Sequence, residues 1–150
     1  MPQSLAALYV HLVYSTKDRS PALAAEWRPR LFEVMGGIAR NKECVLLEAG
    51  GVLDHVHVLV SLHRQECVAD LVRDLKANSS NWIHQSIVNL TDFAWQAGYA
   101  AFSVGYRELA EARKYIREQV KHHSSISFQD EMRLLFSEQG VQYDERYVWS

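Results

Sequence analysis

Two histidines separated by one residue lie in a stretch, residues 54–62 (DHVHVLVSL), that otherwise has the pattern of a buried β-strand. Successive side chains of a strand point to opposite faces, so His55 and His57 should project to one side while Val56 and Val58 project to the other. Two imidazoles side by side can share a metal ion. The alternative is a pair of strand histidines that face solvent or are satisfied by hydrogen bonds.

The chain is large enough for one compact domain and little more. It has 150 residues, of which 48% are hydrophobic, so we predict a single domain over residues 1–150. Residues 1–16 lack a basic leader segment and are too short and too polar to span a bilayer. Cys44 and Cys67 stand alone, without the spacing of a disulfide framework or a zinc knuckle. A cytoplasmic protein without a membrane association is therefore expected.

The charge of the chain excludes one class of nucleic-acid binder. A formal net charge of −2 does not suit a protein that coats nucleic acid through bulk positive charge. Any such contact must be local. Residues 113–123 are one candidate because this segment contains four Lys or Arg residues and a single acidic residue. A solvated helix face has the same composition.

Periodicity and turn residues predict the order of the secondary structure. Gly50 and Gly51 are expected to form the turn between the second and third strands. The order β-α-β-β-α-β followed by helices predicts an α+β, ferredoxin-like (split βαβ) fold, an antiparallel sheet with helices on one face plus a C-terminal catalytic helix. The predicted strands are residues 5–15, 44–48, 54–62 and 93–104, and the predicted helices are residues 22–41, 68–89, 107–122 and 127–139.

A tyrosine and a glutamine in the third predicted helix add a possible nucleophile and an oxygen ligand. Gln119 follows Tyr115 by four residues, so on a helix the two side chains share one face. The phenol can attack a phosphorus atom while the amide carbonyl helps two histidines to hold a metal. Phenol has a pKa near 10, so an aryl phosphate ester keeps a good leaving group and a cut strand can be rejoined without ATP. The chain contains no GxxxxGK[ST] phosphate loop, which agrees with such a reaction.

Taken together, these residues resemble the single-tyrosine HUH transposases of the insertion-sequence 200/605 group. The resemblance spans essentially the whole chain and rests on His-hydrophobic-His in a strand followed by Tyr-x-x-x-Gln in a helix. Further segments that carry it are residues 11–19 (HLVYSTKDR), 50–57 (GGVLDHVH), 70–83 (DLVRDLKANSSNWI), 95–99 (WQAGY) and 143–149 (YDERYVW).

The resemblance implies a small homodimer that binds single-stranded DNA folded into imperfect hairpins at the ends of a mobile element. It makes His55, His57 and Gln119 the ligands of Mg²⁺ or Mn²⁺, and Tyr115 the nucleophile that takes the 5′ phosphate. It also implies that the tyrosine helix can pack against the partner's histidines, which would build the active site in trans. The residues expected to contact the hairpin are Lys17, Arg19, Arg73, Lys76 and Lys121.

The function predicted from the sequence is a metal-dependent DNA transposase that cleaves and rejoins single strands through a 5′-phosphotyrosine. A domesticated, non-cleaving hairpin-DNA-binding protein on the same fold is a second hypothesis, and a silent binder has no need of Tyr115, Gln119 and both histidines. A third is a histidine-metal phosphohydrolase acting on a small molecule, which would use water and would not need a helical tyrosine.

Overall fold

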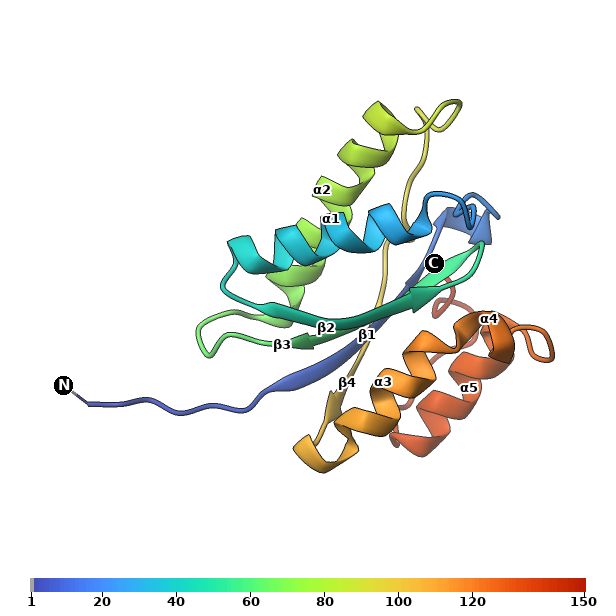
Figure 1. Cartoon of the computed structure of the whole chain (residues 1–150). Helices are drawn as coiled ribbons and strands as arrows, with labels where there is room; N and C mark the ends of the chain where they lie inside the picture. Colours follow the sequence, from blue (N-terminus) through green and yellow to red (C-terminus); the bar gives the residue numbers. More distant parts are fainter. Residues whose placement is uncertain (1) are drawn as a thin grey trace.

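A computed structural model describes residues 2–150 and confirms the predicted ferredoxin-like topology (Figure 1). The sheet has the order β2-β3-β1-β4, and all its neighbouring strands are antiparallel. Two βαβ halves therefore interlock, as the element order requires. The strands are β1 (Tyr9–Ser15), β2 (Val45–Gly51), β3 (His55–Ser61) and β4 (Ala100–Val104).

Helices cover both faces of this sheet (Figure 1). The first two lie on one face, and the three that follow β4, the predicted C-terminal catalytic helix among them, lie on the other. The helices are α1 (Arg28–Asn41), α2 (Val68–Ser86), α3 (Leu109–Arg117), α4 (Gln119–His122) and α5 (Phe128–Glu138), with single 3-10 turns η1 (Lys17–Arg19) and η2 (Tyr106–Glu108).

Alternating side chains of the strands divide the interior into two apolar clusters. The larger cluster lies between the sheet and α1 and α2, and Val56 and Val58 of β3 belong to it. The smaller one lies on the opposite face, where Val13 and Phe102 of the sheet meet α5. Its members from α5 are Phe128, Met132 and Phe136. The second cluster fixes α5 against the face that carries the two histidines.

Several predicted boundaries were wrong. The strand predicted from residue 5 begins at Tyr9, and the helix predicted from residue 22 begins only at Arg28, where Pro29 supplies a favourable first turn. Gly50 and Gly51 end β2 instead of forming the turn. The strand predicted over residues 93–104 is limited to β4, because residues 93–99 run irregularly beside α2 with a single bridge from Trp95 to Thr16.

The helix predicted over residues 107–122 is broken. The structure has the short turn η2, then α3, and then α4, and Glu118 between the last two has φ −96° and ψ 23°. Tyr115 and Gln119 thus belong to two consecutive helical segments. Their phase is nearly kept, since the Glu118 amide still donates to the Lys114 carbonyl at 3.1 Å.

Within residues 2–150, none of the helices combines the length and the apolar character that a membrane crossing requires.

Candidate metal and nucleophile site

The strand β3 presents both histidines to the face covered by α3, α4 and α5. His55 and His57 are completely buried, and they are paired in register with Ser15 and Val13 of β1. Val56 and Val58 point into the other cluster. The prediction that the two imidazoles share one side of the sheet is confirmed.

The Nδ1 atom of each imidazole is held by a neighbour, which turns its Nε2 atom inward. Nδ1 of His55 lies 2.7 Å from a carboxylate oxygen of Asp54, and Nδ1 of His57 lies 2.7 Å from Nε2 of His11. Burial, reinforced by the charge of His57, lowers the pKa of His11 to about 3, so His11 is neutral and accepts the hydrogen bond. Second-sphere partners of this kind fix the tautomer in which Nε2 is available to a metal.

His11 is a functional residue that the sequence analysis did not single out. It comes from β1 and reaches His57 across the strand pair, two positions along from the directly opposed Val13. The signal in the sequence was a histidine in an apolar strand pattern, in phase with Val13 and Ser15, and the structure leaves it only 7% exposed.

Tyr115 and Gln119 reach the same site. The side-chain carbonyl oxygen of Gln119 lies 3.2 Å from Nε2 of His55. The Tyr115 ring centroid is 5.7 Å from that of His57 and 6.1 Å from that of His11. The structure thus brings together the four residues predicted to form the site, with the Gln119 oxygen beside Nε2 of His55 and the phenol beside His57.

In the single chain that the structure describes, the tyrosine helix is docked in cis, and the arrangement in trans implied by the resemblance stays a prediction about the dimer. Helix α3 packs against β2 and β3 of its own chain, and Ile116 is fully buried in that contact. The close approach depends on Gly50, because a Cβ atom built there would lie 1.8 Å from the backbone oxygen of Ile116. A glycine at this point of β2 is what allows α3 to lie against the sheet.

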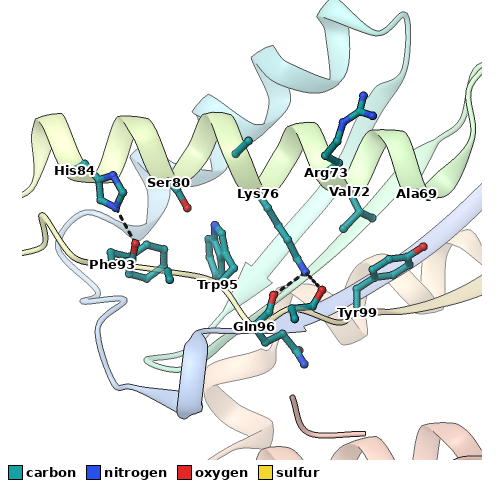
Figure 2. A pocket seen from close by; sticks show the side chains of 13 residues that line it. Ala69, Val72, Arg73, Lys76, Ser80, His84, Phe93, Trp95, Gln96 and Tyr99 are labelled. Atoms are coloured by element: carbon teal, nitrogen blue, oxygen red, sulfur yellow. Dashed lines mark hydrogen bonds between the residues drawn. The ribbon is translucent and has the colours of Figure 1, made fainter. Parts of the chain in front are cut away.

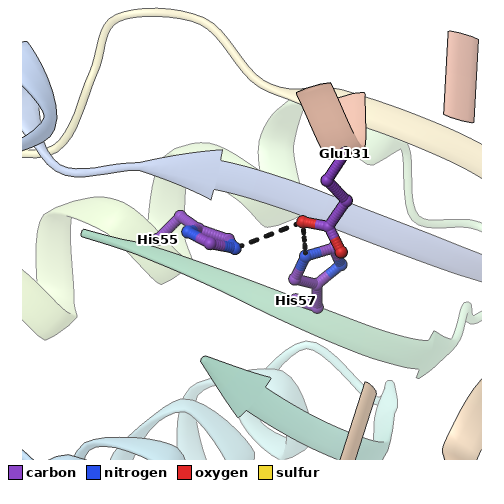
Figure 3. A group of neighbouring side chains, drawn as sticks. All are labelled: His55, His57 and Glu131. Atoms are coloured by element: carbon purple, nitrogen blue, oxygen red, sulfur yellow. Dashed lines mark hydrogen bonds and ion pairs between the residues drawn. The ribbon is translucent and has the colours of Figure 1, made fainter. Parts of the chain in front are cut away.

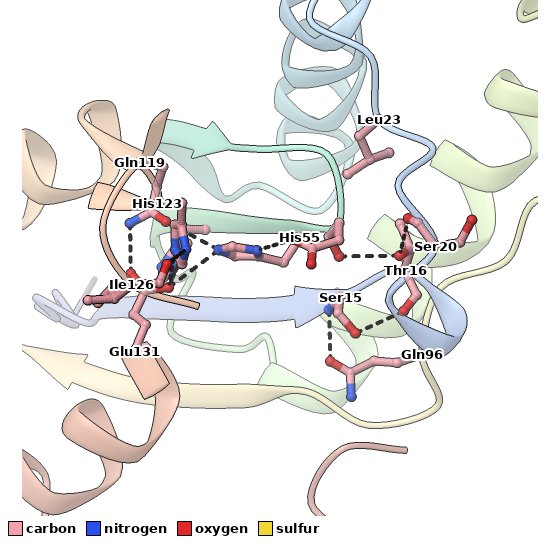
Figure 4. Close-up of polar contacts among 12 residues, drawn as sticks. Ser15, Thr16, Ser20, Leu23, His55, Gln96, Gln119, His123, Ile126 and Glu131 are labelled. Atoms are coloured by element: carbon pink, nitrogen blue, oxygen red, sulfur yellow. Dashed lines mark hydrogen bonds and ion pairs between the residues drawn. The ribbon is translucent and has the colours of Figure 1, made fainter. Parts of the chain in front are cut away.

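A buried carboxylate that the sequence analysis missed lies at the centre of the site. Glu131 of α5 is 1% exposed, and its Oε1 atom lies 3.3 Å from Nε2 of His55 and 3.1 Å from Nε2 of His57 (Figure 3). Its Oε2 atom accepts hydrogen bonds from Gln119 at 3.0 Å and from the Tyr115 hydroxyl. His123 approaches Oε1 as well (Figure 4). The overlooked signal was an acid on the apolar side of a predicted helix, three residues after Phe128.

The electrostatics of the site favour positive charge beside Glu131. Burial alone would raise the pKa of Glu131, but the contacts from His123, His55 and His57 outweigh it and hold that pKa well below its usual range. For His55, burial lowers the pKa, yet Asp54 and Glu131 outweigh it and the net shift is upward. Burial and then the charge of Glu131 raise the pKa of Tyr115, so the phenol is protonated in the resting site.

The five basic residues predicted to contact DNA are spread over the surface. Lys17, Arg73 and Lys121 are exposed and Arg19 is half-buried, so these side chains are accessible to a ligand. Lys76 differs from them, because its ammonium group donates to the carbonyl oxygens of Gln96 at 2.9 Å, Ala97 at 3.3 Å and Gly98 at 2.6 Å. Figure 2 shows the contact with Gln96.

The contacts of Lys76 predict a structural role. Replacing Lys76 by alanine should lower the free energy of unfolding by about 1–3 kcal/mol, because the carbonyl oxygens of residues 96–98, two of them in part-buried contacts, lose a charged donor. Urea unfolding followed by circular dichroism measures the change. Arg73→Ala, one turn earlier on α2 and exposed, is the control and should leave the unfolding midpoint unchanged. Equal midpoints for both variants would contradict the structural role of Lys76.

Comparison with known protein families gives the class of protein that this fold and site define, which is a transposase. Residues 4–119 match the family described as "Transposase IS200 like", and the chain belongs to that family. The matched region includes both histidines, Tyr115 and Gln119, and it ends at Gln119.

Individual relatives agree with this assignment. The chain is 26% identical over 117 residues to the ISDra2 transposase TnpA of Deinococcus radiodurans, which covers 75% of this chain and 84% of the relative. It is also 26% identical over 117 residues to the transposase for insertion sequence element IS200 of Salmonella typhimurium, covering 74% of this chain and 76% of the relative.

Two solved structures share the fold. One is a crystal structure from Deinococcus radiodurans assigned as a transposase, with a TM-score of 0.63 and 23% identity over 77% of this chain and 95% of that chain. The other is a REP-associated tyrosine transposase bound to a REP hairpin, with a TM-score of 0.61 and 12% identity over 84% of this chain and 74% of that chain.

Proposed function

We propose that this transposase cleaves and rejoins single-stranded DNA at hairpin-marked ends through a covalent bond between Tyr115 and the 5′ phosphate. The observation that carries the proposal is that the Tyr115 hydroxyl contacts the same carboxylate, Glu131, as the inward-facing Nε2 atoms of His55 and His57. A silent DNA-binding protein has no need of that arrangement.

The donor set fits a divalent metal. The Nε2 atoms of His55 and His57 and the carbonyl oxygen of Gln119 face one another, and the Nδ1 atoms of both histidines are already engaged. Imidazole nitrogen suits Mn²⁺ better than Mg²⁺, and both are candidates for the site. A bound cation would polarise the scissile phosphate and stabilise the leaving oxygen.

The side chains of this chain account for the movement of atoms. The Tyr115 oxygen forms a bond to phosphorus, and the bond from phosphorus to the 3′ oxygen of the preceding nucleotide breaks. The phenol proton passes by way of Oε2 of Glu131, the acceptor that the hydroxyl already contacts, to the departing 3′ oxygen, which leaves as a hydroxyl. Attack by a 3′ hydroxyl on the phosphotyrosine reverses these steps and rejoins the strand, so no nucleotide cofactor is consumed.

Binding of hairpin DNA is also part of the proposal. The chain shares its fold with a tyrosine transposase solved with a REP hairpin, and Lys17, Arg19, Arg73 and Lys121 offer accessible positive charge. Tyr115 lies 5.7 Å, between ring centroids, from His57 of its own chain, and if this arrangement is kept, association into a homodimer, which we also propose, would bring two complete sites together.

A covalent-adduct experiment tests the proposal. The purified protein is incubated with Mn²⁺ and a pool of single-stranded DNA hairpins with randomised flanks, labelled at either the 5′ or the 3′ end, and resolved on a denaturing gel. A 5′-phosphotyrosine retains the strand 3′ of the cut, so a protein-linked band is expected with the 3′ label, and only a shortened strand with the 5′ label. EDTA should abolish both products, and excess Mn²⁺ should restore them.

The other outcomes identify the alternatives. A band shift on a native gel without cleavage would indicate a hairpin-binding protein that does not cut. Cleavage without a protein-linked band would indicate a phosphohydrolase that uses water. A protein-linked band that resists EDTA would contradict the role of the metal while keeping that of Tyr115.

A further inference from the structure

Helix α5 and the turn before it bring two more potential ligands to the histidine pair. The Oε1 atom of Glu131 lies 2.9 Å from Nε2 of His123, in addition to its contacts at 3.3 Å with His55 and 3.1 Å with His57. Both Glu131 and His123 lie beyond residue 119, where the match to the family ends. They are a feature of the C-terminal part of this chain, which the family match does not cover.

The three imidazoles are oriented in the same way. Nδ1 of His123 lies 2.8 Å from the carbonyl oxygen of Ile126, to which it donates. The Nδ1 atoms of His55 and His57 are held by Asp54 and His11, as described above. Every Nε2 atom therefore points at one carboxylate oxygen, and in the neutral tautomer each presents a lone pair to it. Lone pairs that converge on an anion repel it unless a positive charge lies between them.

The spacing of these atoms agrees with a coordination shell. Ligands bound at about 2.1 Å to one divalent cation are separated from each other by about 3 Å. The three distances from Oε1 of Glu131 to the imidazole nitrogens, 2.9 to 3.3 Å, fall in this range. The nitrogen atoms of His55 and His57 and the carboxylate of Glu131 all lie within 4.8 Å of one another.

Charge balance supports the same conclusion. Glu131 is buried, and within residues 2–150 all of its ion pairs are made with histidines, with neither lysine nor arginine among its partners. A buried carboxylate requires compensation by a positive charge. A protonated His55 supplies it in the metal-free site, and a divalent cation between Glu131 and the imidazoles would supply it in the loaded site.

We propose that Glu131 is an anionic ligand of the divalent cation held by His55, His57 and Gln119, and that His123 positions its Oε1 atom from outside the ligand group. This inference deepens the proposed function and rests on it. Helix α5 is then part of the metal centre. Its packing through Phe128, Met132 and Phe136 serves to place the carboxylate opposite the strand histidines. The imidazole ligands His55 and His57 also predict that Mn²⁺ binds more tightly than Mg²⁺.

Metal binding, measured without DNA, tests the inference. Isothermal titration calorimetry should show that Glu131→Gln binds Mn²⁺ at least about tenfold more weakly than the unmodified protein does. The Mn²⁺ affinity of His123→Ala should be lower as well. Asp130→Asn is the matched control, because Asp130 is the preceding acid on α5, is exposed and pairs with Arg133. Its Mn²⁺ affinity should be unchanged.

A crystal structure of the unmodified protein soaked in Mn²⁺ gives a second measurement that does not depend on any variant folding. The expected result is anomalous density bonded to His55, His57 and a Glu131 oxygen. Unchanged Mn²⁺ affinity in Glu131→Gln would overturn the inference. Tighter Mn²⁺ binding in this variant would also overturn it, because it would show that the carboxylate competes with the metal for the imidazoles. If His55→Ala loses Mn²⁺ while Glu131→Gln keeps it, the ligand role of Glu131 fails and the proposed function stands.

Discussion

Replacing Tyr115 by phenylalanine is expected to lower the yield of protein-linked DNA by at least about 10³-fold, because the variant has no oxygen to form the phosphotyrosine. The ring that packs near His11 and His57 is retained, so the fold and the DNA-binding surface should persist. Affinity for the hairpin pool, measured by a native gel shift, should equal that of the unmodified protein.

Tyr106→Phe is the matched control for this substitution. Tyr106 lies in η2, only a few residues before α3, and is 75% exposed, so removing its hydroxyl should leave the yield of protein-linked DNA unchanged. An adduct that persists in Tyr115→Phe would disprove the nucleophile assignment.

Mixing two inactive variants separates the arrangement in cis from that in trans. If each chain uses its own tyrosine, as the docking of α3 indicates, a mixture of Tyr115→Phe with His57→Ala should form no more adduct than either variant alone. Recovery of adduct in the mixture would show that Tyr115 of one chain serves the histidines of another, with α3 released from the position described here.

The fold could be predicted because its signals are local. The alternation in residues 54–62 and the helical period of residues 68–89 each reflect one face buried against the core, and the element order then leaves few topologies. The same alternation placed His55 and His57 on one face. Their neighbours Tyr115 and Gln119 could be predicted from chemistry, since few residue types supply a nucleophile and an oxygen ligand.

The two residues of the site that were not predicted, His11 and Glu131, depend on contacts between segments that are distant in the sequence. His11 reaches His57 only through the register of β1 with β3, and Glu131 reaches the histidines only through the packing of α5 on the sheet. Neither register nor helix docking is encoded in a local period. The break at Glu118 also lies within a sequence whose apolar period continues, so the pattern predicts one helix where the structure has two segments.

Gly50 shows how a residue typical of turns can have another purpose. Its place before Gly51 predicts a turn, whereas the structure uses it inside β2 to admit the α3 backbone. Glycine in a strand often marks a close approach by another chain segment, and this is such a case. The position of Tyr115 therefore depends on the absence of a Cβ atom at residue 50 of β2.

Substitution of Gly50 by alanine should move Tyr115 on α3 away from His55 and His57 on β3. The new Cβ atom would lie 1.8 Å from the carbonyl oxygen and 2.8 Å from the carbonyl carbon of Ile116, both backbone atoms that cannot move without shifting α3. We expect destabilisation by about 1–3 kcal/mol in urea unfolding and a loss of protein-linked DNA approaching that of Tyr115→Phe. Mn²⁺ should still bind, more weakly, because His55 and His57 stay on β3.

Gly36→Ala makes the same chemical change where there is space, and it distinguishes this effect from a general intolerance of alanine. A Cβ atom at Gly36 on α1 meets only the end of the Arg40 side chain at 3.9 Å. Alanine in the interior of a helix is favoured over glycine by about 0.5–1 kcal/mol, so this variant should be at least as stable as the unmodified protein and should cleave equally well. If Gly50→Ala also cleaved normally, α3 would not need its close contact with β2, and the position of Tyr115 would have to be set by its contact with Glu131 and by the packing of α5 instead.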